Sequence, residues 1–212
     1  MNYLDGPKSQ GNYKRIDESD DSYFYGEPRL LIHVDQHAST TLATYFEQWL
    51  PEKGIILDLM SSYCSHLPDG VAYKSVVGLG MNEVELKENP RLTECLVHDL
   101  NKDPLLPFDD NYFDACLISF SIQYLLKPVE VLADIARILK PLGVCHVAYS
   151  NRTFPTKAVA IWLSSANSEK AKLIKYNFDE SLMYDPPEID WLVASGKGFD
   201  PLCVVRAARR AN

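Results

Sequence analysis

The segment IILDLM at residues 55–60 decides how this chain is read, because it is a short apolar run that carries a single carboxylate, Asp58. Four further apolar runs follow it along the chain, at residues 75–79, 95–98, 115–120 and 144–149. Continuous apolar strands of this length are typical of a parallel sheet whose two faces are both covered. We therefore predict five strands of such a sheet.

The segments between these runs predict helices. Pro128 suits the first position of a helix whose apolar face would be built from Leu132, Ile135, Ala136 and Leu139. Asn82 and Glu85 have the spacing of a capping box at the start of a shorter helix. Ahead of the first strand, Thr41 is expected to cap a helix that carries Leu42, Tyr45, Phe46 and Trp49 on one face.

The alternation of strands and helices predicts a doubly wound, Rossmann-like α/β sheet with helices on both faces. Residues 188–193 and 202–205 add two more strands, and the short loop between them predicts that they pair antiparallel. The expected sheet thus has seven strands, the last of them antiparallel. Before these two strands, Thr156 is expected to cap a helix that reaches Leu163, and Ser168 is expected to cap a second helix.

Composition divides the chain into three parts and excludes several classes of protein. Residues 1–22 are polar and predict a flexible tail, residues 23–53 a helical arm, and residues 54–212 the α/β domain. The net charge of −8 argues against nucleic acid as a partner, and no segment is apolar enough for a membrane partner. The N-terminus has no apolar signal core, and five widely spaced cysteines suit a reducing compartment, so we expect a cytoplasmic protein.

In a doubly wound sheet, ligands bind beyond the carboxyl ends of the strands. The residues that follow the five predicted strands are rich in polar groups, with one carboxylate after each of two strands, Asp58 and Asp99. A ligand that carries both an amine and a base could use both of them. No group of His, Cys, Asp or Glu has the spacing of a metal site, so no metal is expected.

Three motifs in the expected order carry a resemblance to a known family. LPFDDNYFD at residues 106–114 is similar to the family's entry into strand four, RILKPLG at residues 137–143 to its turn into strand five, and VVGLGMN at residues 76–82 to the end of its strand two. The chain resembles class I S-adenosylmethionine-dependent methyltransferases of the small-molecule, type 11 group. The resemblance implies S-adenosylmethionine as cofactor, S-adenosylhomocysteine as product, a small-molecule acceptor, and a monomer or homodimer.

Carried over by position, the resemblance implies a set of cofactor-binding residues at the strand ends. Asp58 takes the place of the acidic residue in the family's first motif, Asp99 with Leu100 that of the pair that meets the adenine, and Ser119 that of the backbone beside the methionine moiety. The full set is Asp58, Met60, Ser61, Ser62, Gly80, Met81, Asn82, His98, Asp99, Leu100 and Ser119. Several also have plainer interpretations, Asp58 as a strand-end cap and Asp99 as a turn residue.

The chain departs from the family pattern in two places. The loop after the first strand, residues 58–68, contains no glycine where the family's loop is rich in it, and Gly80 stands where an acidic residue usually holds the ribose hydroxyls. Asn82 or Glu83 would have to replace that acid. These departures keep a second hypothesis open, a binding or regulatory module that has lost or altered cofactor binding. An NAD-linked oxidoreductase is excluded, since no G-x-G-x-x-G turn follows the first strand.

The methyl acceptor needs a general base only if it carries a proton on the attacking atom. By residue type and position, the catalytic candidates are His33, Tyr124, Asn151 and Arg152. His33 could pair with Asp35 on one face of an extended segment, or both could simply tie the arm to the domain. Arg152, with Lys157, could grip an anionic acceptor or begin a solvated helix.

Overall fold

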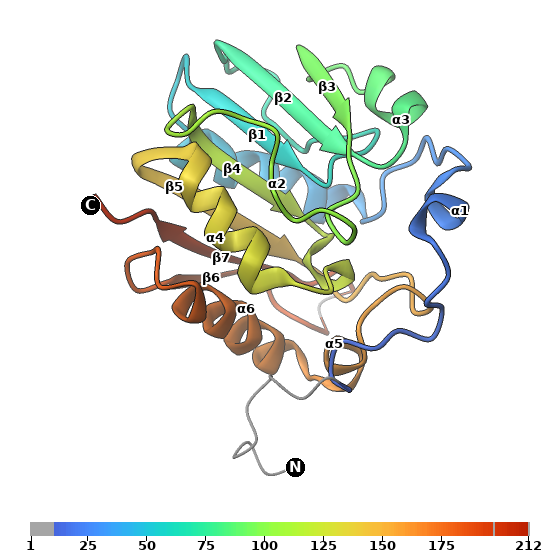
Figure 1. The fold of residues 1–212 in the computed structure, drawn as a ribbon. Helices are drawn as coiled ribbons and strands as arrows, with labels where there is room; N and C mark the ends of the chain where they lie inside the picture. Colours follow the sequence, from blue (N-terminus) through green and yellow to red (C-terminus); the bar gives the residue numbers. More distant parts are fainter. Residues whose placement is uncertain (1–10, 197, 212) are drawn as a thin grey trace.

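The structure is a computed structural model that describes residues 11–196 and 198–211. Within these residues seven strands form one sheet in the order β3-β2-β1-β4-β5-β7-β6 (Figure 1). The strands are β1 (Ile55–Leu59), β2 (Ser75–Gly80), β3 (Glu94–Val97), β4 (Phe113–Ser119), β5 (Leu139–Tyr149), β6 (Glu188–Val193) and β7 (Leu202–Ala208). The first five run parallel to one another, whereas β7 pairs antiparallel with both β5 and β6. The predicted sheet is thereby confirmed.

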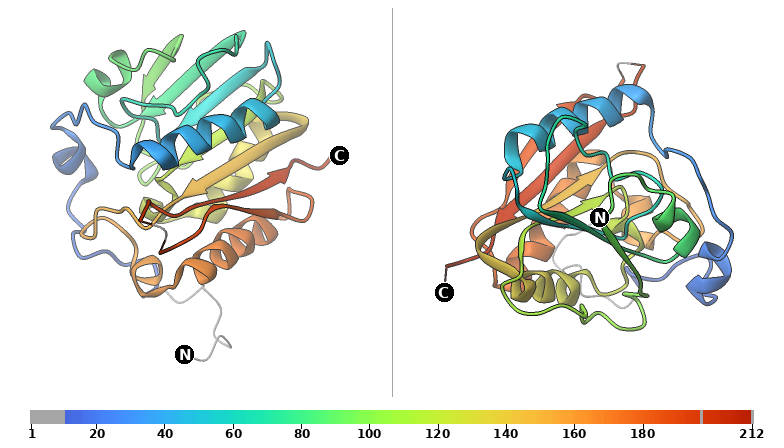
Figure 2. Two further views of the ribbon diagram at one scale, coloured as in Figure 1. Left: turned by 180° about the vertical axis from the view of Figure 1, so that it is seen from behind. Right: turned by 90° about the horizontal axis from the view of Figure 1, so that it is seen from above.

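Helices cover both faces of this sheet (Figure 2). They are α1 (Asp21–Tyr25), α2 (Gln36–Trp49), α3 (Glu83–Lys87), α4 (Pro128–Ile138), α5 (Ala160–Ser164) and α6 (Asn167–Ser181), and Ile122–Tyr124 forms one 3₁₀ turn. The long helix α2 lies on the face opposite α4 and α6 (Figures 1 and 2). Burial between these layers supplies the main stabilisation of the domain.

The two covered faces explain why β1 is apolar at nearly every position. Leu57 and Leu59 belong to the core cluster that includes α4 and α6, whereas Ile56 belongs to the second cluster, with Phe46 of α2. Successive side chains of a strand point to opposite faces, so a strand covered on both sides has no solvent-facing position. The two clusters thus lie on opposite faces of β1, which is an inner strand of the sheet.

Several predicted helix boundaries are wrong. Helix α2 begins at Gln36 rather than after Thr41, because the Asp35 carboxylate accepts a hydrogen bond from the Ala38 amide at 2.8 Å. Helix α6 begins at Asn167 rather than after Ser168, with the Glu169 carboxylate accepting from the Ala166 amide at its start. Thr156 caps no helix, since α5 begins only at Ala160. Pro128 is at the start of α4 as predicted.

The arm over the sheet begins earlier than predicted. Residues 1–10 of the predicted tail lie outside the described residues, but Arg15 already packs against Asp21, and its guanidinium donates to both carboxylate oxygens at 2.8 and 2.9 Å. The Asp17 amide donates to the Thr156 carbonyl at 2.8 Å. The arm passes from here through α1 toward α2, beyond the strand ends (Figures 1 and 2).

Three of the cysteines, Cys116, Cys145 and Cys203, are buried free thiols, as expected for small apolar residues. Cys95, although it lies in an apolar run, is exposed on the edge strand β3. Among the described helices, none has the length and apolar character that a membrane span requires.

Candidate functional site

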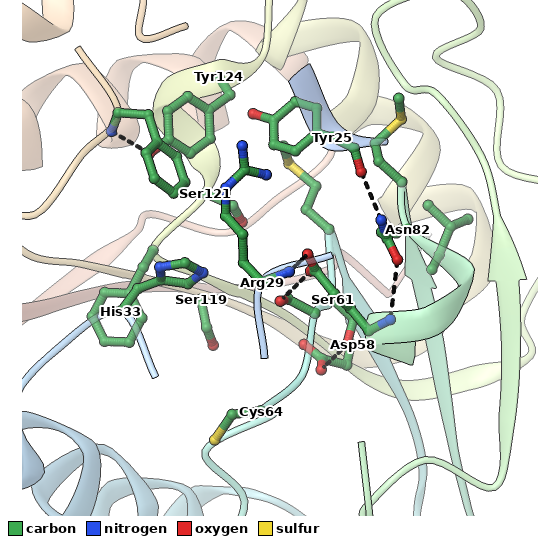
Figure 3. A pocket seen from close by; sticks show the side chains of 18 of the residues that line it. Tyr25, Arg29, His33, Asp58, Ser61, Cys64, Asn82, Ser119, Ser121 and Tyr124 are labelled. Carbon is green, nitrogen blue, oxygen red and sulfur yellow. Dashed lines mark hydrogen bonds between the residues drawn. The ribbon is translucent and has the colours of Figure 1, made fainter. Parts of the chain in front are cut away.

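A cavity of about 250 Å³ opens at the carboxyl ends of β1, β2 and β4, where the doubly wound sheet predicts a ligand site (Figure 3). Its floor comes from the residues that follow these strands, and its cover comes from the arm. Figure 3 shows Tyr25, Arg29 and His33 of the arm around the space above Asp58, Ser61, Ser119 and Ser121. The arm therefore turns an open strand edge into an enclosed site.

The loop after β1 makes its turn without glycine. Met60 has φ 55°, in the left-handed region that favours glycine. The loop therefore keeps the backbone conformation of a glycine turn, and Met60 is strained because it carries a Cβ there. The Ser61 amide then donates to the Leu79 carbonyl at 2.8 Å, which brings the loop onto the end of β2. A Cβ on Gly80 would collide with the Ser61 carbonyl oxygen. The small residue that this contact needs is on β2 rather than in the loop.

Asp58 is fully enclosed at the end of β1. Its carboxylate accepts the Ser61 hydroxyl at 2.6 Å, and its exposed fraction is 2%. Burial raises the pKa of Asp58 to about 6, against the hydrogen bonds from Ser61 and Ser65, which lower it. This carboxyl is therefore half-protonated near pH 6 and mostly ionised at neutral pH, and a pKa shifted in this way is typical of residues at functional sites.

Asn82 fastens α3 to the arm. Its Oδ1 accepts from the amides of Val84 and Glu85 at 3.0 and 3.1 Å, which confirms it as the cap of α3. Its Nδ2 donates to the carbonyl oxygens of Tyr25 and Gly26 at 2.8 and 3.0 Å. All the main hydrogen-bonding capacity of this amide is thus used within the protein.

Glu85 does not close the predicted capping box. Its Oε1 accepts the Arg29 amide at 2.7 Å and its Oε2 the Ser62 hydroxyl at 2.6 Å, so it joins the arm to the first loop. Glu83 instead pairs with Lys87 at 2.6 Å on the exposed side of α3. Of the α3 carboxylates that the structure describes, Glu85 is the one that lines the pocket.

The end of β3 supplies one side of the pocket. Leu100 is buried, and Asp99 accepts the Asn101 amide at 3.0 Å in the turn that follows. Asn101 then donates through Nδ2 to the Asp21 carboxylate at 2.9 Å and to the Tyr124 carbonyl at 3.0 Å. One side chain thereby holds together the arm, the β3 turn and the segment after β4.

Several polar atoms at the end of β4 and on the arm are buried in the pocket with no partner among the described residues. They are the hydroxyl oxygens of Ser119, Ser121 and Tyr25. A buried hydroxyl without a hydrogen bond costs free energy of about 1–3 kcal/mol. Their gathering in one cavity indicates that the cavity is built for a polar ligand.

His33 and His66 line the same pocket and are uncharged at neutral pH. Burial lowers the pKa of His33, with the positive charge of Arg29 acting in the same direction and Glu85 against it. Burial also lowers the pKa of His66 to about 4. His66 Nδ1 lies 2.9 Å from the Ser39 hydroxyl, whereas His33 has its ring edge against Phe154. Of the two alternatives for His33 and Asp35, the structure does not show the pair: Asp35 caps α2 and accepts the Asp200 amide, which ties the arm to the domain.

The pocket gathers every cofactor-binding candidate derived from the sequence: Asp58, Met60, Ser61, Ser62, Gly80, Met81, Asn82, His98, Asp99, Leu100 and Ser119. Of the catalytic candidates, His33, Tyr124 and Arg152 line it, and exposed Asn151 does not. The roles assigned to these residues stay predictions.

Four pocket residues are not among the site residues predicted from the sequence: Tyr25 and Arg29 of the arm, Glu85 and Ser121. The aromatic cluster YFY at residues 23–25 and the lone Arg29 after it were the available signal.

The amino-acid sequence is similar to sequences of known methyltransferases. Residues 60–147 match the family described as methyltransferase domain. A demethylmenaquinone methyltransferase from Clavibacter sepedonicus is 28% identical over 103 residues, which cover 43% of this chain and 42% of that protein. The matched part thus spans less than half of this relative.

Solved structures share the fold at low sequence identity. The [4+2]-cyclase SpnF superposes with a TM-score of 0.64 at 14% identity, covering 90% of this chain and 92% of that one. An S-adenosylmethionine-dependent methyltransferase from Mesorhizobium loti superposes with a TM-score of 0.54 at 16% identity, covering 80% and 98%. The sheet order and these likenesses show that the chain has the fold of S-adenosylmethionine-dependent methyltransferases, and the family match identifies a methyltransferase domain at residues 60–147.

Proposed function

We propose that this protein transfers a methyl group from S-adenosylmethionine to a small-molecule acceptor that binds beneath the arm. The observation that carries the proposal is the pocket itself: the residues that correspond to the family's cofactor contacts line one cavity with the unpartnered hydroxyls of Ser119, Ser121 and Tyr25. These hydroxyls fit a ligand rich in polar groups, as S-adenosylmethionine is.

The cofactor would extend across the ends of the three strands. Asp99 and Leu100 would hold the adenine, and Asp58 with Ser61 would face the amino-acid end beside Ser119. Because Asn82 is fully engaged and Glu83 points away, Glu85 is our candidate for the ribose hydroxyls in place of the family's acid. When bound, the cofactor supplies a methyl group already activated by the sulfonium.

The residues of the chain would then orient the acceptor and exclude water. The aromatic rings of Phe154 and Tyr124 line the pocket and stack with their centroids 6.0 Å apart, and Phe24 packs against Phe154 at 5.3 Å. Such walls suit a planar acceptor, and the curated relative from Clavibacter is named for one, demethylmenaquinone. His33, uncharged at neutral pH, would accept a proton where the acceptor must lose one.

Calorimetry tests the proposal directly. Titration with S-adenosylmethionine and S-adenosylhomocysteine should show binding by the wild-type protein, and Asp58→Ala should weaken it at least tenfold, about 1.4 kcal/mol. Asp69→Ala, an exposed carboxylate just beyond the loop, serves as the matched control and should leave the affinity unchanged. No binding at millimolar concentrations would sink the proposal.

The alternative is a methyltransferase fold with a different task. The glycine-free first loop motivates it, and so does the similarity to SpnF, a protein of this fold named as a cyclase. This alternative predicts no transfer of a labelled methyl group even where the cofactor binds.

A further inference from the structure

Arg29 brings into the pocket a positive charge that no carboxylate of the described residues pairs with. Its guanidinium donates to the carbonyl oxygens of Phe24 at 2.9 Å and of Glu27 at 3.4 Å. It lies over the Phe24 ring at 4.5 Å and 5.3 Å from the centre of the Phe154 ring. Figure 3 shows the side chain extending into the cavity. Neutral carbonyls and rings hold the guanidinium in place but do not neutralise its charge.

The other charged groups of the pocket are already engaged. Asp21 is paired with Arg15 and Lys157, and Arg152 with Asp200 at 2.8 Å. The Glu85 carboxylate is shared between the Arg29 amide and the Ser62 hydroxyl, which leaves the guanidinium to other partners. Arg29 is therefore the cation of the described pocket that remains available to a ligand.

A second observation points to the same ligand chemistry. Ser121, 8% exposed, lines the pocket, and its hydroxyl has no partner among the described residues. The Tyr25 hydroxyl, on the arm like Arg29, is equally buried and unpartnered. Hydroxyl groups and a guanidinium that line the same pocket supply O–H and N–H donors, which are the groups that an anion accepts hydrogen bonds from.

The Arg29 guanidinium is also held in one orientation before any ligand binds. It has five N–H donors in one plane, and the contacts above use only two of its nitrogens. Its planar fork matches the two oxygens of a carboxylate, and the Phe24 ring keeps that plane from turning. Holding the fork in position before binding lowers the entropy lost on binding.

We propose that Arg29, assisted by the Ser121 hydroxyl, binds a carboxylate group of a ligand in this pocket. The inference rests on the proposed function, and two ligands of the reaction could supply the carboxylate: the amino-acid end of the cofactor or the acceptor. In both cases the arm contributes a binding residue as well as a cover.

Calorimetry with paired probes separates these sources. Decarboxylated S-adenosylmethionine has a hydrogen in place of the carboxylate of S-adenosylmethionine. Benzoate and benzamide, which has a neutral amide in place of the carboxylate, serve as acceptor probes in protein saturated with S-adenosylhomocysteine. The variants are Arg29→Gln and Arg29→Lys. Arg91→Gln is the matched control, since Arg91 also stacks on a ring, Tyr73, and donates to a carbonyl, Val71, outside the pocket.

If the cofactor supplies the carboxylate, Arg29→Gln weakens S-adenosylmethionine about tenfold or more and leaves the decarboxylated analogue within about twofold. If the acceptor supplies it, cofactor binding is unchanged, and the preference of the wild type for benzoate over benzamide disappears. Arg29→Lys retains part of either effect, because the charge stays but the fork is lost. Arg91→Gln changes neither.

Equal weakening of both cofactor analogues, or no change in either probe pair, overturns the inference and leaves Arg29 as a tie for the end of α1. Near-ultraviolet circular dichroism identifies a variant that has lost its tertiary structure. If the wild type binds neither cofactor analogue, it is the proposed function that fails. The benzoate and benzamide pair, titrated without S-adenosylhomocysteine, then decides the inference on its own.

Discussion

The carbonyl oxygen of Ser61 lies against the α-carbon of Gly80 so closely that no side chain fits between them. This contact joins the loop after β1 to the end of β2, and the Ser61 amide fixes it by donating to Leu79. The backbones of β2 and of the loop after β1 thus approach each other closely at the carboxyl ends of these strands. The glycine that allows this lies on β2, whereas the family pattern has glycine in the loop.

Gly80→Ala should therefore be strongly destabilising. We expect a loss of about 2 kcal/mol or more in the free energy of unfolding, because the methyl group must push backbone rather than a flexible side chain. Gly80→Asp, which restores the residue type of the family, should be worse. Urea denaturation measures both. Gly70→Ala is the control, since a Cβ there meets nothing within 4 Å, and it should change stability little. Equal effects at positions 70 and 80 would contradict the packing described here.

Two leucines occupy backbone conformations that favour glycine. Leu142 has φ 66° in the turn inside β5, and Leu182 has φ 60° at the end of α6, and both side chains are exposed. Leu142→Gly and Leu182→Gly should each stabilise the protein by about 0.5–1 kcal/mol, because the relief of left-handed strain exceeds the greater chain entropy of glycine.

Thermal unfolding measures the effect, and Leu105→Gly gives the comparison. Leu105 is as exposed as Leu142 but is not among the residues with positive φ, so the same change there should lower the melting temperature. A lowered melting temperature for Leu142→Gly would show that its side chain contributes more than its backbone strain costs.

Asp58 should make stability fall as pH rises through the acidic range. Its pKa is about 6 in the folded protein and lies near 3.8 when unperturbed, so between these values the folded state binds more protons than the unfolded state. The free energy of unfolding therefore decreases from pH 4 to pH 6, by up to about 3 kcal/mol from this group, and is level above that. Chemical denaturation of wild type and Asp58→Asn at several pH values measures it. Parallel pH profiles for the two proteins would rule the effect out.

Lys157 should be essential for docking the arm. Its ammonium is fully buried, lies 3.1 Å from the carboxylates of both Asp17 and Asp21, and donates to the Ser19 carbonyl at 2.9 Å. Lys157→Met leaves Asp21 with less compensation in a buried site, and we expect a loss of about 3–5 kcal/mol.

Limited trypsin digestion should then cut the arm faster in Lys157→Met than in wild type. Lys102→Met removes an exposed ion pair with Asp20 and should leave the free energy of unfolding nearly unchanged, because solvent screens such pairs. An arm that resists trypsin equally in both variants would show that apolar packing, not this ion cluster, holds it.

The sheet could be predicted from the sequence because the patterns that indicate its strands and helices lie within short segments. Strand β1 is apolar at consecutive positions since both of its faces are covered, and Pro128 marks the start of α4 through its own backbone geometry. The positions of the cofactor candidates followed from the same rule, because parallel strands end at one edge. Helix α2 was misjudged because Asp35, its true cap, also exchanges hydrogen bonds with Asp200, which is far away in the sequence.

By itself, then, the sequence predicted the seven-stranded α/β sheet with an antiparallel last strand, and it named residues at the strand ends that the structure brings together in one pocket. Only the tertiary structure decided what covers that pocket. Lys157 and Asp21 are 136 positions apart, and Glu85 meets the arm through the Arg29 amide, so no periodicity or spacing encodes their pairing. Buried charges take their partners from whatever the fold brings within reach, and here the fold brings the arm, with Arg29, over the strand ends.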